Sequence, residues 1–253
     1  SAHLGISMGR GGTEVAKEAS DVVLLDNNFR SIISAIEEGR SIYSTIKKVL
    51  LYLVSTSIGE FFSITVAIAL GFPLPLSPSQ ILWLNLVTDG FFVVALAFEP
   101  NVSIKEKIKS IGNTDLLSRE SLTRAFLMGF TMMFGTLALF YIGYSVGSYK
   151  VWTLSLTLLV VFQWFNAWNC RSDKNSAFYK TFSNIYLLFG LLGALLLHIF
   201  ALYNPFMNKI LKVVPLDFFD WIIVLMIASS ILLVEETRKI LSNYRSRHLQ
   251  RTT

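Results

Sequence analysis

Long apolar runs alternate with short polar connections through most of this chain. A membrane-spanning helix needs about 20 mostly apolar residues, and several runs reach or approach that length. They cover residues 49–70, 80–98, 122–144, 151–169, 184–203 and 216–234. The pattern therefore predicts a mainly α-helical membrane protein with six transmembrane helices.

The beginning of the chain has a different pattern. LGISMG and DVVLLD have the composition of short strands, RGG that of a turn, and TEVAKEAS that of a short helix. This alternation predicts that residues 1–40 are the end of an α/β domain and that residues 41–253 form a transmembrane domain. We expect one helix to break at Gly39 and a second to run from about Ser41 into the first apolar run.

Two acids interrupt the first two apolar runs. Glu60 and Asp89 lie near the middle of their runs, where an ionised carboxylate costs about 2.5 to 3.5 kcal/mol. Asn85, Thr88 and Asp89 are spaced as i, i+3 and i+4, which would place an amide, a hydroxyl and a carboxylate on one side of a regular helix. Hard cations prefer such oxygen ligands. Gly90 is expected to loosen the helix beside them and to free backbone carbonyls.

The two acids lack a basic partner nearby in the sequence. No Lys or Arg occurs between Val49 and Phe98, so no basic side chain of these two runs can neutralise them. A bound cation or protons must then do so. One interpretation is an ion or proton pathway, the usual role of carboxylates inside membranes. The alternative is that both acids are protonated and hydrogen-bonded between helices.

Composition supports a membrane protein and indicates its orientation. Hydrophobic residues make up 53% of the 253 residues, charged residues 15%, and the net charge is +5. The basic residues collect in alternate connections, as membrane topology requires, and give no indication of nucleic-acid binding. The more basic side carries Lys105, Lys107, Lys109, Arg119, Arg124, Arg171, Lys174, Lys180, Arg238, Lys239, Arg245, Arg247 and Arg251. The opposite side carries Lys150, Lys209 and Lys212.

This asymmetry predicts an integral, multi-pass protein of the lipid bilayer whose N-terminal part and C-terminal tail both lie in the cytoplasm. We expect the tail beyond residue 234 to be solvated or in contact with lipid headgroups. The sequence gives no indication of which membrane, plasma or internal, contains the protein.

The fourth apolar run carries a polar stripe. Gln163, Asn166 and Asn169 follow one another at intervals of three residues in an otherwise apolar helix. Hydrogen bonds between helices would explain this stripe, and coordination of an ion by Gln163 would explain it equally well. The single cysteine, Cys170, excludes an internal disulfide and a site with several thiolates.

Several of these stretches occur together in one known family. GISMGRGGTEVAKEASDVVLLDNNF, SIGE in the first run, PLPLSPSQILWLNLVTDG through the second and FNAWN in the fourth resemble the C-terminal third of a P-type cation-transporting ATPase. The resemblance covers essentially the whole chain, and it is strongest to the calcium-pump branch, the sarco/endoplasmic reticulum and bacterial-type pumps. It implies that residues 1–40 end the phosphorylation domain and that the six runs are the family's fifth to tenth membrane helices.

The resemblance also implies a set of ion ligands. In the family, the acid of the fifth helix and an Asn, a Thr and an Asp of the sixth helix bind calcium. The corresponding residues here are Glu60, Asn85, Thr88 and Asp89. Two-ion calcium pumps carry an Asn where this chain has Ser57 and a Glu where it has Gln163. Both departures affect the same one of the two sites, so we expect one Ca²⁺ per cycle and a counter-transported proton on Glu60.

The motifs for ATP hydrolysis are not found in this sequence. It contains no DKTGT, TGES or GDGxND motif and no nucleotide-binding domain, so we expect no catalytic residue and no cofactor site in it. The resemblance implies a piece of a longer translocating ATPase whose upstream portion binds ATP and Mg²⁺. That portion, the expected partner, comprises the actuator, nucleotide-binding and phosphorylation domains and the first four membrane helices.

Three other functions remain open. The same oxygen ligands suit Mn²⁺ as well as Ca²⁺, and they are compatible with a monovalent cation. A self-sufficient six-helix secondary transporter would be active in liposomes without ATP, and it would be expected to show an inverted repeat, of which the sequence gives no sign. A membrane scaffold derived from a pump would bind no cation.

Overall fold

The computed structural model describes most of the chain. The described residues are 4–99, 116, 118–173, 175–177 and 184–249. They divide into two compact units, one up to residue 44 and one from residue 45 onward. Several basic residues used above to predict the orientation lie outside the described residues, namely Lys105, Lys107, Lys109, Lys174, Lys180 and Arg251.

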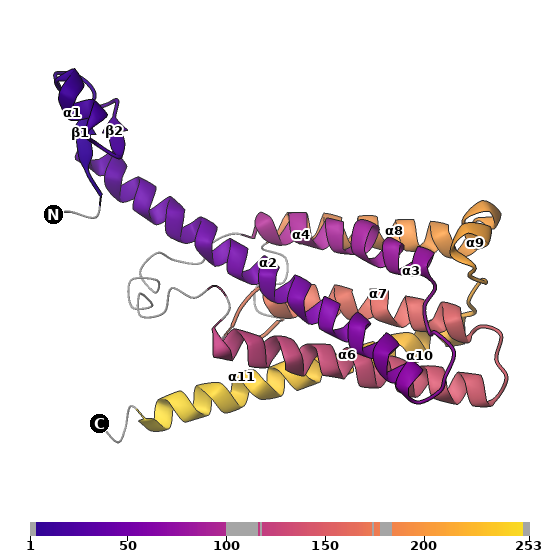
Figure 1. Cartoon of the computed structure of the whole chain (residues 1–253). Helices are drawn as coiled ribbons and strands as arrows, with labels where there is room; N and C mark the ends of the chain where they lie inside the picture. Colours follow the sequence, from indigo (N-terminus) through magenta and orange to yellow (C-terminus); the bar gives the residue numbers. More distant parts are fainter. Residues whose placement is uncertain (1–3, 100–115, 117, 174, 178–183, 250–253) are drawn as a thin grey trace. The chain divides into compact units, whose positions relative to one another are not determined.

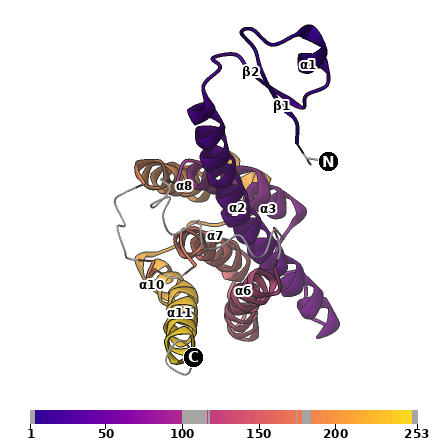
Figure 2. The same cartoon turned by 90° about the vertical axis from the view of Figure 1, so that its left-hand side faces the viewer.

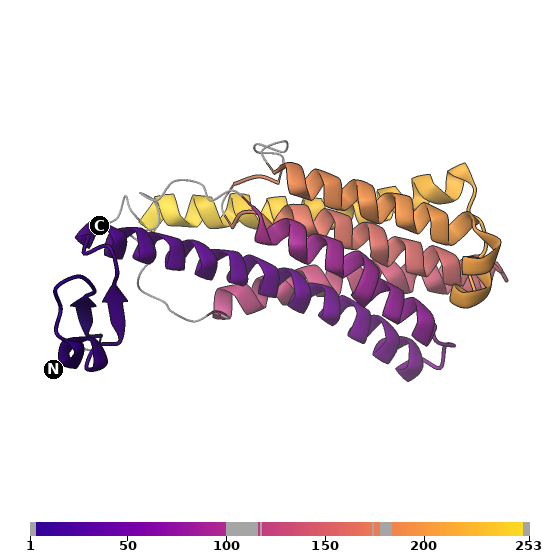
Figure 3. The ribbon, with the colours of Figure 1, turned by 90° about the horizontal axis from the view of Figure 1, so that it is seen from above.

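The first unit contains a small parallel strand pair (Figure 3). β1 (Ile6–Met8) pairs with β2 (Val22–Leu24), and α1 (Glu14–Glu18) connects them. Thr13 begins this helix, because its side chain accepts a hydrogen bond from the backbone N–H of Ala16. The order of strand, helix and strand is the one that the sequence predicts.

The first membrane-spanning helix begins well before its apolar run. α2 (Phe29–Ala69) is a single helix of 41 residues, so the predicted break at Gly39 is wrong. A glycine inside a helix costs only about 1 kcal/mol relative to alanine, which the helix-forming neighbours Glu37, Glu38 and Arg40 offset. One helix therefore contains both the residues that follow β2 and the candidate ligand Glu60.

The second membrane-spanning segment is irregular at its centre. Ser77 starts α3 (Pro78–Trp83) with a capping box, in which its hydroxyl accepts from the N–H of Gln80. A π-helical turn, η1 (Leu84–Thr88), then precedes α4 (Asp89–Ala97). The expected loosening is present, but it lies before Asp89 and not at Gly90, which is an ordinary residue of α4. Such π turns are frequent at functional sites.

α7 lies at the centre of the second unit. The remaining helices of this unit are α6 (Arg119–Ser145), α7 (Val151–Cys170), α8 (Ile185–Tyr203), α9 (Pro205–Leu211), α10 (Phe218–Ala228) and α11 (Ser230–Leu249). α7 is the most buried membrane span, with 83% of its apolar window inside the structure. It packs against α6, α10 and α11 and also contacts η1 and α4. Figure 2 shows α7 enclosed by the other helices of the bundle.

Among the described residues, six helical segments are long and apolar enough to cross a membrane. They are Phe29–Ala69, Pro78–Ala97, Arg119–Ser145, Val151–Cys170, Ile185–Tyr203 and Phe218–Ser242. Each overlaps one of the six predicted runs, which confirms a mainly α-helical fold with six membrane helices. Figure 1 shows how these helices run alongside one another within the second unit.

The helical structure extends further at the C-terminus than the sequence predicts. α11 continues to Leu249, and Glu235 and Lys239 on it are buried, so the expectation of a solvated tail is wrong for its first turns. Arg124, which was counted in a connection, lies inside α6 and is 3% exposed. Ion pairing accounts for this burial, because Arg124 Nε donates to Glu235 Oε1 at 2.6 Å.

α2 and α6 approach each other closely beside Glu60. A Cβ added to Gly59 would lie 2.8 Å from the Cβ of Met132, and one added to Gly129 would lie 2.4 Å from Cγ2 of Ile58. Small residues allow membrane helices to come this close. The two glycines thus determine the separation of α2 and α6 at this level.

Candidate functional site

Glu60 is buried between three helices. It lies on α2 and is 6% exposed. Its Oε2 accepts a hydrogen bond from Asn85 Nδ2 of η1 at 3.3 Å, and its Oε1 accepts one from Gln163 Nε2 of α7 at 3.0 Å. The structure therefore brings three of the predicted site residues together around one carboxylate.

Asp89 is the second buried acid of the site. It is the first residue of α4 and is 3% exposed. Its Oδ1 accepts a hydrogen bond from the hydroxyl of Tyr52 at 2.7 Å, and Tyr52 is itself fully buried on α2. The bond connects α2 and α4 across the pair of membrane helices that carry the two acids.

Among the described residues, both carboxylates interact only with neutral donors. The donors are two amides for Glu60 and one phenol for Asp89. Within the part of the chain that the structure describes, neither acid has an ion pair with Lys, Arg or His. If ionised, the two acids carry negative charge that these neighbours do not balance, and such charge is costly in a low-dielectric interior.

The other predicted ligands differ in their surroundings. The hydroxyl of Thr88 is buried and donates to the carbonyl of Leu84 at 2.6 Å, within the π turn itself. Asn85 and Ser57 are both exposed in the described chain. The regular α-helical spacing of residues 85, 88 and 89 assumed above does not hold, because Asn85 and Thr88 lie within the π turn η1 and Asp89 follows it. Figure 1 shows η1 only as the stretch between α3 and α4.

The polar stripe of α7 is buried along its whole length, and each member has its own partner. Asn166 Nδ2 donates to Ser55 Oγ of α2 at 2.7 Å, and Asn169 Nδ2 donates to the carbonyl of Ile231 of α11 at 3.1 Å. Together with the bond from Gln163 to Glu60, these contacts confirm that the stripe makes hydrogen bonds between helices. The Oε1 of Gln163 is buried without a partner among the described atoms, and it is therefore free to accept from water or to ligate an ion.

The chemistry of these groups suits a hard cation. Two carboxylates, the Gln163 amide oxygen and the Thr88 hydroxyl are all oxygen donors, and Ca²⁺ takes 6 to 8 such ligands. Among the described residues, no group of three or more His, Cys, Asp or Glu side chains could hold a metal. The described side chains thus provide part of an oxygen coordination shell and no soft-metal site.

Sequence reasoning missed Tyr52 as a neighbour of the site. This residue is close to the start of the first apolar run, where a tyrosine is typical of the membrane interface. Its distance of 37 positions from Asp89 gives no local signal. The buried partners Arg124 and Glu235 were missed for the same reason, because they are 111 positions apart.

Comparison with known proteins identifies the family. A family model described as "Cation transporting ATPase, C-terminus" matches residues 73–241, which is more than half of the chain. The chain belongs to the cation-transporting ATPase family. This result confirms the resemblance drawn from the sequence motifs. The matched region begins in the connection after α2 and ends within α11, so it covers both η1 and the polar stripe of α7.

Individual relatives within the cation-transporting ATPases extend the match. A "Calcium-transporting ATPase" of Plasmodium falciparum (isolate K1 / Thailand) is 36% identical over 100% of this chain and 24% of its own length. "Calcium-transporting ATPase 2, endoplasmic reticulum-type" of Arabidopsis thaliana is 31% identical over 99% of this chain and 30% of its own length. A "Calcium-transporting ATPase" of Bacillus subtilis (strain 168) is 36% identical over 88% of this chain and 26% of its own length. The chain thus spans less than a third of these relatives.

Proposed function

We propose that this chain is the membrane portion of an ATP-driven Ca²⁺ pump and supplies half of its transport pathway. The observation that carries the proposal is the burial of Glu60 and Asp89, in membrane-spanning helices, with neutral hydrogen-bond donors only. Such a pair needs an external positive charge, and a transported cation provides it in one state of the cycle.

The donor set and the relatives both favour Ca²⁺ as the substrate. Carboxylate, amide and hydroxyl oxygens match the preference of Ca²⁺, and the relatives compared above carry the name of calcium-transporting ATPases. In this proposal the ligands are Glu60, Asn85, Thr88 and Asp89, with Gln163 as a weaker contributor. The exposed positions of Asn85 and Ser57 are consistent with further ligands from an upstream portion, including its first four membrane helices.

We further propose one Ca²⁺ per cycle. Ser57 is exposed and has no hydrogen bond to Glu60 among those described, and Gln163 carries no charge, so the site that depends on these two positions is weakened. Without a bound cation, a proton neutralises Glu60, and that proton would be the counter-transported one. The test is the number of Ca²⁺ ions taken up per ATP by the full-length pump in vesicles. A ratio of two would refute this part of the proposal.

ATP chemistry is assigned to the upstream portion, which would bind ATP and Mg²⁺. Mg²⁺ would there neutralise charge on the transferred phosphoryl group. In this chain the coupling element is α2, because it is one continuous helix from the end of the α/β segment to the backbone around Glu60. Both the N-terminal unit and the C-terminal end of α11 would lie in the cytoplasm. Labelling of cysteines introduced near Gly11 and Leu249 by an impermeant reagent tests that orientation.

The deciding experiment is the substitution Asp89→Asn in the full-length pump. It removes charge without changing shape, and we expect it to abolish Ca²⁺-dependent phosphorylation by ATP. Asp217→Asn is the matched control, because this aspartate lies at the start of α10 with its side chain 77% exposed. Normal Ca²⁺-stimulated turnover of the Asp89→Asn pump would refute the site. Competition with Mn²⁺ in the same assay tests the choice of ion.

A further inference from the structure

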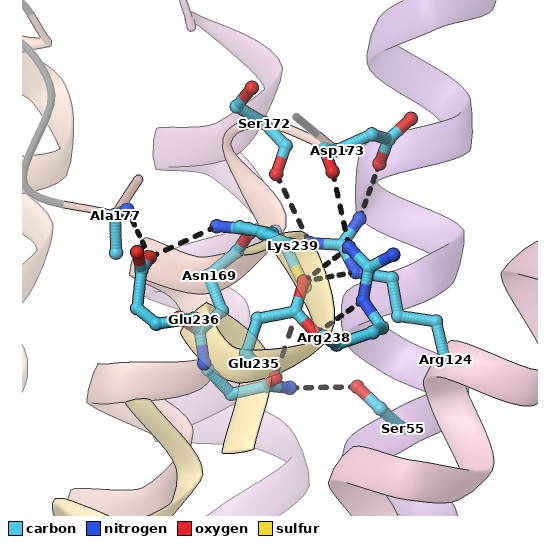
Figure 4. Close-up of polar contacts among 12 residues, drawn as sticks. Ser55, Arg124, Asn169, Ser172, Asp173, Ala177, Glu235, Glu236, Arg238 and Lys239 are labelled. Carbon is cyan, nitrogen blue, oxygen red and sulfur yellow. Dashed lines mark hydrogen bonds and ion pairs between the residues drawn. The ribbon is translucent and has the colours of Figure 1, made fainter. Parts of the chain in front are cut away.

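A buried ionic cluster surrounds the C-terminal end of α7. We call it the α6–α11 charge cluster, and its members are Arg124, Asp173, Glu235, Glu236, Arg238 and Lys239. It holds as many basic as acidic side chains. Glu235 is fully buried and Arg124 is 3% exposed, so the centre of the cluster is shielded from solvent. Figure 4 shows the polar contacts among these side chains.

Arg124 makes the contacts that join the three helices. Its Nε donates to Glu235 on α11, and its Nη1 forms an ion pair with Asp173. Its Nη2 donates to the backbone carbonyls of Asn169 at 2.7 Å and Ser172 at 3.2 Å. The Asn169 carbonyl belongs to the last turn of α7, where a helix leaves its last carbonyls unpaired and carries partial negative charge, and Ser172 lies two residues beyond the end of the helix. A guanidinium can bind a carboxylate and these carbonyls at once because its donors form a planar fork.

Arg124 is not the only basic partner of Glu235. Arg238 also binds Glu235, with Nε at 2.9 Å from Oε2 and Nη2 at 2.8 Å from Oε1. The residue that follows α7 has a second attachment, since Arg171 Nε donates to Glu99 at 2.9 Å. Replacing Arg124 therefore leaves Glu235 paired and the end of α7 connected to the segment after α4.

The polar stripe of α7 extends from this cluster to the candidate cation site. The first stripe residue, Asn169, accepts a hydrogen bond from Arg124 through its backbone carbonyl. The other two stripe residues donate to α2, Asn166 to Ser55 and Gln163 to Glu60. Six residues of helix separate the first and last of these contacts, a distance of about 9 Å. Figure 4 shows the hydrogen bond that Ser55 accepts from Asn166, which is the second of these three contacts.

We infer that Arg124 is a positioning residue for the transported cation. By binding the last carbonyls of α7, it determines the axial position and rotation of this helix, and thereby the placement of the Gln163 amide against Glu60. This inference rests on the proposed function. Gln163 is sensitive to such placement, because its Nε2 has one bond to Glu60 and its Oε1 is buried and unpartnered among the described atoms.

The opposite end of α7 provides a matched control. There Lys150 binds Asp217 and Asp220 of α10, and the Asp217 side chain is 77% exposed. This ion pair is also attached to α7, but its Asp217 carboxylate is open to solvent, and it contacts no described member of the polar stripe. A variant at Lys150 therefore disturbs α7 without disturbing the series from Arg124 to Glu60.

The test uses the full-length pump and Ca²⁺ itself. We measure the Ca²⁺ concentration for half-maximal phosphorylation by ATP, together with the maximal phosphorylation level, in Arg124→Gln, Arg124→Lys and Lys150→Gln. Arg124→Gln should raise the half-maximal concentration roughly 3- to 30-fold at an unchanged maximal level, the range seen for residues that act through a network. Arg124→Lys should be intermediate, because an ammonium is a single point charge. Lys150→Gln should respond as the wild type does.

A double-mutant cycle separates positioning from general destabilisation. Gln163→Leu should itself weaken the Ca²⁺ response, and Arg124→Gln should then have no further effect on affinity in that background. Independent, additive losses would overturn the inference. An unchanged Ca²⁺ affinity in Arg124→Gln would also overturn the inference. If the glutamine variant does not accumulate, an unchanged Ca²⁺ affinity in Arg124→Lys would do the same. A wild-type pump without any Ca²⁺ response would refute the proposed function, and the inference with it.

Discussion

Two groups of buried acids in this protein are neutralised in different ways. In the α6–α11 charge cluster, Glu235 accepts hydrogen bonds from two guanidinium groups, those of Arg124 and Arg238. In the candidate cation site, Glu60 and Asp89 accept only from amides and a phenol. The cluster carries its own positive charges, whereas the described part of the site does not.

This difference distinguishes a structural role from a transport role. A buried acid with a permanent basic partner is neutral as a pair at all times, and removing one partner leaves an uncompensated charge. A buried acid with neutral partners can exchange protons or cations, because no fixed charge competes with them. Charge removal at Glu235 should therefore impair stability, whereas charge removal at Glu60 or Asp89 should impair ion binding.

The largest effect is expected from neutralising both site acids. The double variant Glu60→Gln and Asp89→Asn keeps the side-chain shapes and should abolish Ca²⁺ binding to the full-length pump. Its thermal stability without Ca²⁺ should not fall, because neutral amides replace buried carboxylates that have no counter-charge in the described chain. Calorimetric titration with Ca²⁺ and a thermal unfolding scan measure the two effects. Unaltered Ca²⁺ affinity would remove the basis of the comparison.

A single change in the charge cluster comes next. Glu235→Leu leaves the buried Arg124 and the partly exposed Arg238 without the carboxylate that they share, and it should destabilise the folded protein by about 3 to 5 kcal/mol. The free energy of unfolding in detergent measures it. Asp173→Asn is the control within the cluster, because the Asp173 side chain is 62% exposed and its contribution is screened by solvent. If Glu235→Leu were as stable as the wild type, the cluster would have no structural role.

The third test concerns the packing of α2 against α6 and involves no charge. In Gly129→Leu the added Cβ alone would lie 2.4 Å from Cγ2 of Ile58, and the rest of the side chain needs still more space. We therefore expect the free energy of unfolding to fall by about 1 to 3 kcal/mol, because α2 and α6 become overpacked. Gly39→Ala is the control, because nothing lies within 4 Å of the added Cβ and alanine favours a helix. Thermal unfolding of both variants should therefore shift in opposite directions. A tolerated leucine at position 129 would contradict the close approach of the two helices.

The smallest effect is expected at Lys150. The hydrogen bonds that Lys150 donates to the carboxylates of Asp217 and Asp220 raise the pKa of this lysine above its ordinary value. A raised pKa in the folded state means that the stabilisation is complete at neutral pH and is lost only when the pH rises through the alkaline range. Lys150→Gln should change the thermal midpoint little and by the same amount across the neutral range. A difference that disappeared near neutrality would require a lowered pKa instead.

Much of the fold follows from local sequence pattern. Apolar length predicts the six membrane helices, and the strand and turn residues before Asn27 predict the two short strands, which the structure pairs in parallel. The predicted helix ends are wrong where a single residue or a change in hydrophobicity is outweighed by the neighbouring residues. Gly39 does not end a helix whose neighbours favour it, and α11 continues past its apolar run because Glu235 and Lys239 find buried partners.

The candidate site is predictable only in part. Glu60 and Asp89 are visible in the sequence because acids are rare in apolar runs. For Gln163 the sequence leaves two interpretations open, hydrogen bonding between helices and coordination of an ion. Tyr52 and Arg124 are not visible in this way, since each contacts a residue of another helix at a sequence distance that no periodicity encodes. Those contacts depend on how helices pack and not on any one helix.

The π turn at Leu84–Thr88 makes the length of its helix a functional property. Each residue of an α-helix advances the chain by about 100° and 1.5 Å, so deleting one residue from this turn would rotate everything beyond it by that angle. The Asp89 carboxylate would then leave the direction of Tyr52, although every ligand type would still be present. Insertions and deletions between Gln80 and Asp89 therefore alter the phase of the ligands, an effect that substitutions of the ligands themselves do not probe.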